Sequence, residues 1–242
     1  KPFIRYASTE GSSATPTAPD TTSLYANNRV IRFAITGDNL VSGHTIPAST
    51  VSRVAIESGT ASNEITFALV NKAYFETFYT TKLPCRLCHN DTKLNNILFD
   101  KTSKKALCLV DLDTLMAGYF HYDFGDAVRT VVSESKEDEQ VITNINFNLT
   151  LFEEFVKGLF THNFNLTEKE IKLLPISCAL MPFMHGLRAL TDYLNGNIYY
   201  KVSYKNQNLD RCISLFEFTK KALKYQDDIT YIIEKQLIQN NF

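Results

Sequence analysis

The sequence predicts an α+β fold in which a small β-hairpin leads into a mostly helical carboxy-terminal lobe. Two observations predict the hairpin: the apolar runs 96–99 and 106–110 have the length of strands, and the polar stretch 100–105 between them has the composition of a turn. A third observation predicts the helical lobe, because most of the chain after Asp126 reads as helical. The expected helices are 149–161, 168–195, which contains Pro175 and Pro182 as kinks or breaks, and 209–238.

The chain divides at about residue 62 into a short amino-terminal lobe, 1–62, and a carboxy-terminal lobe, 63–242. Residues 8–23 are rich in Ser, Thr and Pro and have almost nothing to bury, so we expect this segment to be flexible. From Asn63 to Tyr79, apolar residues recur at helical spacing and predict a helix that leads into the following loop. Short β-like runs precede this helix at 29–35 and 50–56.

Composition excludes several classes of protein. The 242 residues can bury a full core, and a formal net charge of −1 gives no basic field for nucleic acid or for an anionic membrane surface. Five cysteines, an odd number, argue against a secreted disulfide framework. Because we find no secretory signal and no apolar run that approaches the length of a membrane span, we expect a monomeric cytoplasmic protein without a membrane partner.

The most informative residues are His89, Asp91 and Asn96, which follow the H-x-D-x-x-x-x-N pattern of kinase catalytic loops. The first strand of the predicted hairpin begins at Asn96 and the second ends at Asp111, so closing the hairpin brings these two side chains together. Mg²⁺ is held by one or two protein carboxylates with phosphate oxygens and water, so this small set is sufficient. Asp and Asn are also common in turns, but the ordered combination of all four residues is far more specific.

Two other patterns are interpreted differently. Asp123-Phe124-Gly125 has the letters of the kinase metal-binding triplet, yet Asp111 has the better spacing from Asp91, so Asp123 is expected to be a buried carboxylate that ties the loop to the next helix. The run Cys85 to His89 matches C-x-x-C-H, but haem attachment requires export and a single C-x-x-C leaves a zinc site incomplete.

A capping box is expected where Thr167 precedes Glu170 by three residues.

Four parts of the chain carry a resemblance to a known superfamily: 83–100, with His89-Asn90-Asp91-Thr92-Lys93-Leu94-Asn95-Asn96; 110–114; 122–129, with Tyr122-Asp123-Phe124-Gly125-Asp126; and 186–196. They resemble the aminoglycoside phosphotransferase and choline kinase superfamily, most of all the bacterial N-acetylhexosamine 1-kinases, over residues 62–242. The resemblance implies a protein-kinase-like fold of two lobes. It also implies ATP- and Mg²⁺-dependent phosphorylation of the anomeric hydroxyl of N-acetylglucosamine or N-acetylgalactosamine.

The resemblance also implies roles for single residues. Asp91 becomes the catalytic base at the acceptor hydroxyl, and Asn96 and Asp111 become the magnesium ligands that hold the nucleotide. Asp113 becomes a second acidic neighbour of the metal or of the sugar. Lys93 is placed to meet the transferring phosphate, as in kinase loops that read D-x-K, and the alternative is a solvated lysine.

The segment from His185 to Asn195 is the candidate sugar pocket. Arg188, Asp192 and Asn195 are spaced by four and three residues, which places them along one face of a helix. Polar side chains of this kind can form paired hydrogen bonds with a sugar, and Tyr193 could lie against its apolar face. The alternative is an Arg–Asp surface pair beside a tyrosine of the core.

The amino-terminal part departs from the kinase pattern. A kinase needs a strand-borne lysine and a loop that covers the phosphates, but Lys1 is the only lysine before Lys72 and no Gly-rich loop is present. The amino-terminal lobe is therefore short or incompletely represented in this chain. Three functions remain open: the sugar kinase, another small-molecule phosphotransferase of the aminoglycoside or choline kinase type, and a non-catalytic pseudokinase that binds a ligand.

Overall fold

The computed structural model describes residues 61–76, 78 and 82–240. The expected flexible segment 8–23, the β-like runs at 29–35 and 50–56, and Lys1 lie outside these residues. The described residues fall into two compact units: one lies within 61–78 and 184–216, and the other within 82–183 and 217–240. The boundary expected at residue 62 stays a prediction.

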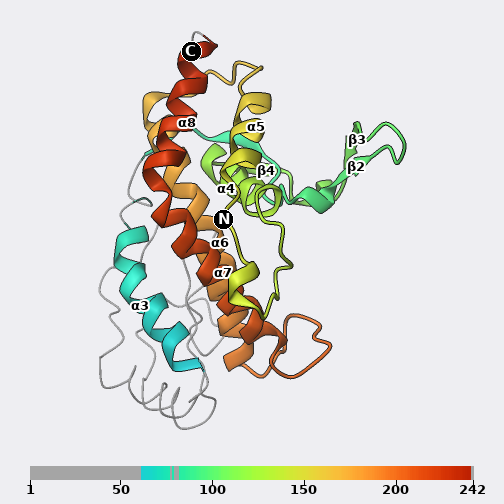
Figure 1. Ribbon diagram of the computed structural model, residues 1–242, viewed down its shortest axis with the longest axis vertical. Helices are drawn as coiled ribbons and strands as arrows, with labels where there is room; N and C mark the ends of the chain where they lie inside the picture. Colours follow the sequence, from blue (N-terminus) through green and yellow to red (C-terminus); the bar gives the residue numbers. More distant parts are fainter. Residues whose placement is uncertain (1–60, 77, 79–81, 241–242) are drawn as a thin grey trace, which may run out of the picture. The chain divides into compact units, whose positions relative to one another are not determined.

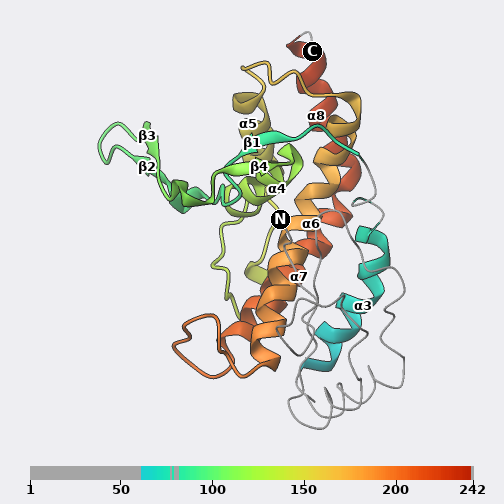
Figure 2. The same cartoon turned by 180° about the vertical axis from the view of Figure 1, so that it is seen from behind.

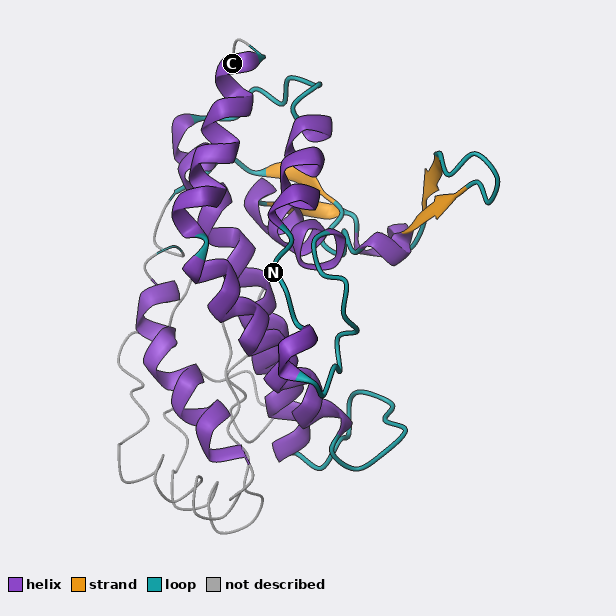
Figure 3. Ribbon diagram, viewed as in Figure 1, coloured by secondary structure: helices purple, strands orange, loops and turns teal. Residues whose placement is uncertain are grey.

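The second unit contains two small antiparallel sheets (Figure 3). Strand β1 (Arg86–Cys88) pairs with β4 (Met116–Gly118), and β2 (Ile97–Phe99) pairs with β3 (Ala106–Leu109). The β2–β3 pair is the expected hairpin, which extends away from helices α4 and α5 of the same unit (Figures 1 and 2). Short 3₁₀ turns precede β2, as η2 (Leu94–Asn96), and separate β3 from β4, as η3 (Leu112–Thr114); a further one, η4 (Ile142–Asn144), lies later in the chain.

The hairpin closes through the polar turn that the sequence predicts. The Asp100 backbone N–H donates to the carbonyl oxygen of Lys105 at 2.8 Å, and the Asp100 carboxylate accepts the N–H of Ser103 at 2.6 Å. Lys104 takes a left-handed backbone conformation with φ 59°. These bonds set the register that places Ile97 opposite Leu109.

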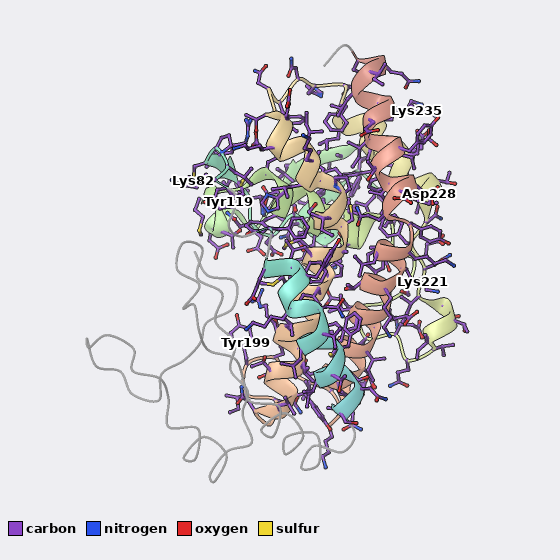
Figure 4. All side chains as sticks on the ribbon, turned by 90° about the vertical axis from the view of Figure 1, so that its left-hand side faces the viewer. Lys82, Tyr119, Tyr199, Lys221, Asp228 and Lys235 are labelled. Atoms are coloured by element: carbon purple, nitrogen blue, oxygen red, sulfur yellow. The ribbon has the colours of Figure 1, made fainter. Side chains whose placement is uncertain are left out.

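The helices of the second unit surround an apolar core. Helix α5 (Leu149–Leu159) packs against both α4 (Phe120–Val131) and α8 (Gln226–Gln239). At the surface, Lys235 of α8, labelled in Figure 4, donates to Glu153 of α5 at 2.7 Å. The core side chains of these helices that are essentially inaccessible to solvent include Val128, Phe152, Val156, Ile229 and Ile233.

Helix α6 (Glu168–Leu194) begins with the predicted capping box. Glu170 accepts the backbone N–H of Thr167 at 2.8 Å, and its own N–H donates to the Thr167 hydroxyl at 3.4 Å. Pro175 and Pro182 lie inside one continuous helix, so neither of them breaks it. Gly125 of α4 is needed for close packing, because a Cβ there would lie 2.3 Å from the carbonyl oxygen of Ser177.

Among the described residues, α6 is also the one helix that is long and apolar enough, by length and composition, to cross a membrane. The expectation that no apolar run approaches the length of a membrane span is therefore wrong for α6. In this structure most of the apolar part of α6 is buried, as is usual for the core helix of a folded domain.

The helix expected at 209–238 is in fact two helices, α7 (Gln207–Lys224) and α8. They separate at Tyr225, whose φ of −94° and ψ of 17° leave the helical region. The charges on either side suit two helix ends: α7 finishes with Lys221 and Lys224, and α8 starts with two acidic residues, Asp227 and Asp228. Cations near the carboxy-terminus of a helix and anions near its amino-terminus interact favourably with the helix dipole.

The first unit contains α3 (Ser62–Glu76), which corresponds to the helix expected from Asn63 to Tyr79. The Phe67 ring packs on Phe216 with ring centroids 4.8 Å apart. Gly186 makes room for the Phe216 ring, because a Cβ at this glycine would lie 2.6 Å from a ring carbon. Helices α6 and α7 each contribute residues to both units.

Candidate active site

Four polar side chains of the second unit converge beside the hairpin. The carboxylate oxygen Oδ2 of Asp91 accepts from Asn96 Nδ2 at 2.9 Å and lies 2.6 Å from Lys93 Nζ. Oδ2 of Asp111 lies 3.5 Å from the same Asn96 nitrogen and 3.9 Å from Lys93 Nζ. The structure therefore brings together Asp91, Lys93, Asn96 and Asp111, as the sequence predicts, although their roles stay predictions.

The hairpin positions the Asn96 side chain beside that of Asp111. Asn96 ends the η2 turn and its carbonyl oxygen accepts the N–H of Val110 at 2.9 Å, which continues the β2–β3 ladder by one step. Asp111 follows directly and has a left-handed backbone with φ 62° and ψ 50°, which ends the strand. Two residues distant in sequence thus meet at one end of the hairpin.

The carboxamide of Asn96 is held in one orientation. Its Nδ2 group donates both to the carbonyl oxygen of Asp91 at 2.8 Å and to Oδ2 of the same residue at 2.9 Å. Asn96 is only 5% exposed, so these bonds fix a buried group. The amide oxygen, which is the atom a hard cation prefers, is left for another partner.

The donor set fits Mg²⁺. An amide oxygen of Asn96 and a carboxylate of Asp111 are both hard oxygen ligands, and Asp111 is about half exposed, with 48% of its side chain accessible. Among residues 61–76, 78 and 82–240, no three His, Cys, Asp or Glu side chains gather as a metal site. Asp113 in η3 is exposed, and its place at the metal or at the sugar stays a prediction.

Lys93 is a cation between the two carboxylates. Its hydrogen bond with Asp91 is the main reason that the pKa of the Lys93 ammonium is raised, and the charges of Asp91 and Asp111 act in the same direction. Lys93 therefore stays protonated at neutral pH, and the group is available to an anionic phosphate. The interpretation of Lys93 as a purely solvated lysine does not fit these contacts.

Asp123 of α4 holds the loop that carries Asp91. Its two carboxylate oxygens accept the backbone N–H groups of His89 and Asn90, each at 2.7 Å, and its carbonyl oxygen accepts from the Thr92 hydroxyl at 2.5 Å. Burial raises the pKa of Asp123, and the two N–H donors oppose that shift. The expectation that Asp123 ties the loop to the following helix is confirmed.

His89 connects the same loop to the second strand of the hairpin. Its Nε2 lies 3.1 Å from the carbonyl oxygen of Val110, the residue before Asp111, and the side chain is 6% exposed. This contact gives His89 a structural role in holding the loop.

The sequence did not reveal a buried ion pair on the same helix, α4. Arg129 donates to Oδ1 of Asp126 through Nε at 3.0 Å and Nη2 at 2.9 Å, and it also pairs with Glu137. The negative charge of Asp126 acts on both Lys93 and Asp123, raising the pKa of each. The i,i+3 spacing of an Asp and an Arg on a helix was the available signal.

The predicted sugar pocket lies in the first unit. Asp192 is 5% exposed, and its carboxylate accepts the N–H of Tyr199 at 2.7 Å, the N–H of Tyr200 at 3.0 Å and the amide of Asn208 at 2.8 Å. These bonds anchor the loop between α6 and α7. The structure thus gives Asp192 a loop-anchoring role, and a direct contact with substrate stays a prediction.

The other predicted pocket residues are half-buried. Arg188 and Tyr193 lie on α6, whereas Asn195 lies one residue beyond its end, where its N–H donates to the carbonyl oxygen of Thr191 at 3.0 Å. Sequence reasoning missed Tyr199, whose N–H is bound by Asp192 and whose side chain is 74% exposed (Figure 4).

The β2–β3 hairpin, the convergent Asp91, Asn96 and Asp111, and the helices around them fit the class of kinase-like phosphotransferases. Residues 65–154 match the model of the phosphotransferase enzyme family. The match supports a relationship to the aminoglycoside phosphotransferase and choline kinase superfamily and a phosphotransferase activity in general. It covers all four convergent residues.

Proposed function

We propose that this protein is a kinase that transfers the γ-phosphoryl group of ATP, with Mg²⁺, to a hydroxyl group of a small molecule. The observation that carries the proposal is the position of Asn96 Nδ2, 2.9 Å from Oδ2 of Asp91 and 3.5 Å from Oδ2 of Asp111. A base and two oxygen ligands for a hard cation then lie within one small volume, which is the arrangement that phosphoryl transfer requires.

Each residue has a distinct part in the proposed reaction. Asn96 and Asp111 would hold Mg²⁺, which, when bound, neutralises charge on the phosphate oxygens. Asp91 orients the acceptor hydroxyl and takes its proton as the new bond from oxygen to phosphorus forms and the bond to the ADP oxygen breaks. Because the proton is lost late in a loose transition state, orientation by Asp91 contributes much of its effect.

Lys93 is proposed to contact the transferring phosphate. Its ammonium lies 2.6 Å from the base and 3.9 Å from Asp111, so a phosphoryl group that passes between these carboxylates lies within its reach. A fixed cation at this point stabilises the charge that spreads over the phosphate oxygens.

For the substrate we propose an N-acetylhexosamine that is phosphorylated on its anomeric hydroxyl. The support is the resemblance of the Asp91 loop and of residues 186–196 to N-acetylhexosamine 1-kinases. Within the second of these regions, Arg188, Tyr193 and Asn195 remain the proposed sugar contacts. Asp192 would act by holding the loop that carries Tyr199, an exposed aromatic ring of the kind that packs on sugars.

An ADP-release assay tests the proposal. The 242-residue chain is incubated with MgATP and with N-acetylglucosamine, N-acetylgalactosamine, an aminoglycoside or choline, and the product is identified by phosphorus NMR. We expect release to accelerate with an N-acetylhexosamine and Asp91→Asn to lower the rate by about a thousandfold. Asp227→Asn, at an exposed carboxylate of α8, is the matched control and should leave the rate unchanged. If none of the four acceptors accelerates ADP release, the kinase proposal is wrong.

A pseudokinase is the second candidate. On this alternative the Asp91 site binds nucleotide or sugar without transfer. Calorimetry that detects binding of MgATP, together with no ADP release for any acceptor, would support it.

A further inference from the structure

Asn90, which immediately precedes Asp91, joins three segments of the chain. Its backbone N–H donates to Oδ1 of Asp123 at 2.7 Å. Its side-chain Nδ2 donates to two carbonyl oxygens, those of Cys88 and Thr114, each at 3.1 Å. One carboxamide therefore connects the end of β1 to the turn that follows Asp111.

The backbone at Asn90 takes a conformation that few residues accept. Its φ of 62° lies in the left-handed region, which favours Gly and, among residues with side chains, Asn and Asp. Glycine would meet the backbone requirement but has no carboxamide. Asn meets both requirements at this position. Replacing Asn90 with Gly therefore removes the carboxamide bonds but keeps a residue that accepts the backbone conformation.

The bond to Thr114 acts on the segment that carries the acidic side chains. Thr114 ends the η3 turn, and its hydroxyl lies 3.3 Å from the Asp111 carbonyl oxygen, to which it donates. At the other end, the carbonyl oxygen of Val110 contacts the His89 ring. The segment 110–114 is thus held at both ends by the two residues that precede Asp91.

We propose that Asn90 is a positioning residue that couples the loop carrying Asp91 to the turn carrying Asp111. It sets the separation between the proposed base and the proposed magnesium ligand without contacting substrate. The catalytic part of this inference rests on the proposed kinase function. The mechanical coupling between the two segments does not.

Gly118 of β4 provides the space for this carboxamide. A Cβ at Gly118 would lie 2.9 Å from Oδ1 of Asn90 and 3.1 Å from Cβ of Cys88. Gly118→Ala therefore disturbs the Asn90 side chain without changing Asn90 itself. Gly158 of α5 is the matched control, because a Cβ added there meets nothing within 4 Å.

Amide hydrogen exchange tests the coupling without any need for activity. In Asn90→Gly, the amides of residues 111–116 are expected to exchange about tenfold faster than in the unchanged chain, while those of α5 and α8 keep their rates. Gly118→Ala should accelerate the same amides, and Gly158→Ala should not. Unchanged exchange at 111–116 in both Asn90→Gly and Gly118→Ala would overturn the proposal.

Kinetics test the catalytic consequence. With MgATP and the active acceptor, Asn90→Gly should lower kcat about tenfold and raise the Mg²⁺ concentration for half-maximal rate several-fold, as is usual when a residue behind a metal ligand is removed. KM for the acceptor should stay within about twofold, and the raised Mg²⁺ requirement is the change that a general loss of folded protein would not produce. If kcat falls only in proportion to the fraction of unfolded chain and the Mg²⁺ requirement is unchanged, the positioning role is overturned.

The two proposals fail in different ways. If the unchanged chain phosphorylates no acceptor while Asn90→Gly still accelerates exchange at 111–116, the kinase function is wrong and the coupling by Asn90 stands. If the chain is an active kinase and exchange and kinetics are unaffected in both variants, the coupling is wrong. Should Asn90→Gly fail to fold, Gly118→Ala supplies the same comparison.

Discussion

The Asn96 side chain donates two hydrogen bonds to Asp91. Its Nδ2 group binds the carbonyl oxygen of Asp91 at 2.8 Å and the carboxylate oxygen Oδ2 of Asp91 at 2.9 Å. The same contacts orient two groups at once. They aim the Asp91 carboxylate, and they leave the amide oxygen of Asn96 as the atom available to a cation. The proposed base and the proposed metal ligand are therefore one hydrogen-bonded unit, and a change in either should affect both.

Asn96→Ala should show this coupling directly. We expect kcat with MgATP to fall about a hundredfold and the Mg²⁺ requirement to rise, because the variant loses a metal ligand and two bonds to Asp91. Steady-state rates at a series of Mg²⁺ concentrations measure both effects. Asn95→Ala, at the exposed neighbour in η2, should behave like the unchanged chain. Equal losses at the two positions would contradict the prediction.

Lys93→Met should lower kcat about tenfold, because it removes the cation beside the transferring phosphate but keeps most of the aliphatic stem. The readout is the rate of ADP release at saturating ATP and acceptor. Lys101→Met, at the exposed turn of the hairpin, is the control and should have no effect. A rate in Lys93→Met equal to that of the control would show that Lys93 does not act on the transferring phosphate.

Arg86 and Glu170 form a bidentate pair, with Nε–Oε1 at 2.5 Å and Nη2–Oε2 at 2.9 Å. The pair lowers the pKa of Glu170 to about 2, chiefly through the hydrogen bond from Arg86. Since Glu170 is only 1% exposed, Arg86→Met leaves a buried charge unpaired and should lower the free energy of unfolding by about 3 kcal/mol. Urea denaturation followed by circular dichroism measures this loss.

Lys157→Met is the comparison for that experiment, because Lys157 forms an exposed pair with Glu154 at 3.6 Å. Exposed pairs contribute little, so this variant should change the free energy of unfolding by less than about 0.5 kcal/mol. Similar losses in both variants would show that the Arg86–Glu170 pair contributes no more than a surface contact.

His121 should make the fold sensitive to mild acid. Burial lowers the pKa of His121 to about 4, whereas an unfolded histidine has a pKa of 6.5. Between these values the unfolded chain binds the proton and the folded chain does not. Protonation of His121 therefore costs no stability above pH 6.5. As the pH drops toward 4, the free energy of unfolding falls by about 3 kcal/mol in total. Urea denaturation at several pH values measures this dependence.

His121→Phe keeps a ring beside Tyr119 and Tyr122, which both lie near the His121 ring, and removes the titrating group. The stability of this variant should fall less steeply between pH 6.5 and 4 than that of the unchanged chain. Parallel pH curves for the two proteins would show that His121 does not carry the acid sensitivity.

Several expected elements could be predicted because their causes are local. The turn at Asp100 and the two apolar runs beside it specify the hairpin, and the hairpin alone brings Asn96 to Asp111. The capping box at Thr167 and Glu170 is likewise a matter of neighbouring side chains and backbone N–H groups.

Other features depend on packing, which competes with local preference. The helix expected at 168–195 is confirmed, and of the two effects expected of Pro175 and Pro182 a break is excluded, since a helix held on most sides by the core tolerates the loss of a backbone bond. The break at Tyr225 was missed, because the apolar pattern continues across it and only the change from Lys224 to Asp227 signals two helix ends.

The sequence by itself determined which residues could perform chemistry, since the spacing of Asp91, Asn96 and Asp111 and the hairpin between them depend on neighbouring residues. Only the tertiary structure decided what holds them in place. The partners of Asp123, Asn90 and Arg86 are backbone and side-chain groups from distant parts of the chain, and Asp192 proved to anchor a loop. Hydrogen bonds of this kind follow from how helices and strands pack, and no local pattern encodes the distance between two such segments.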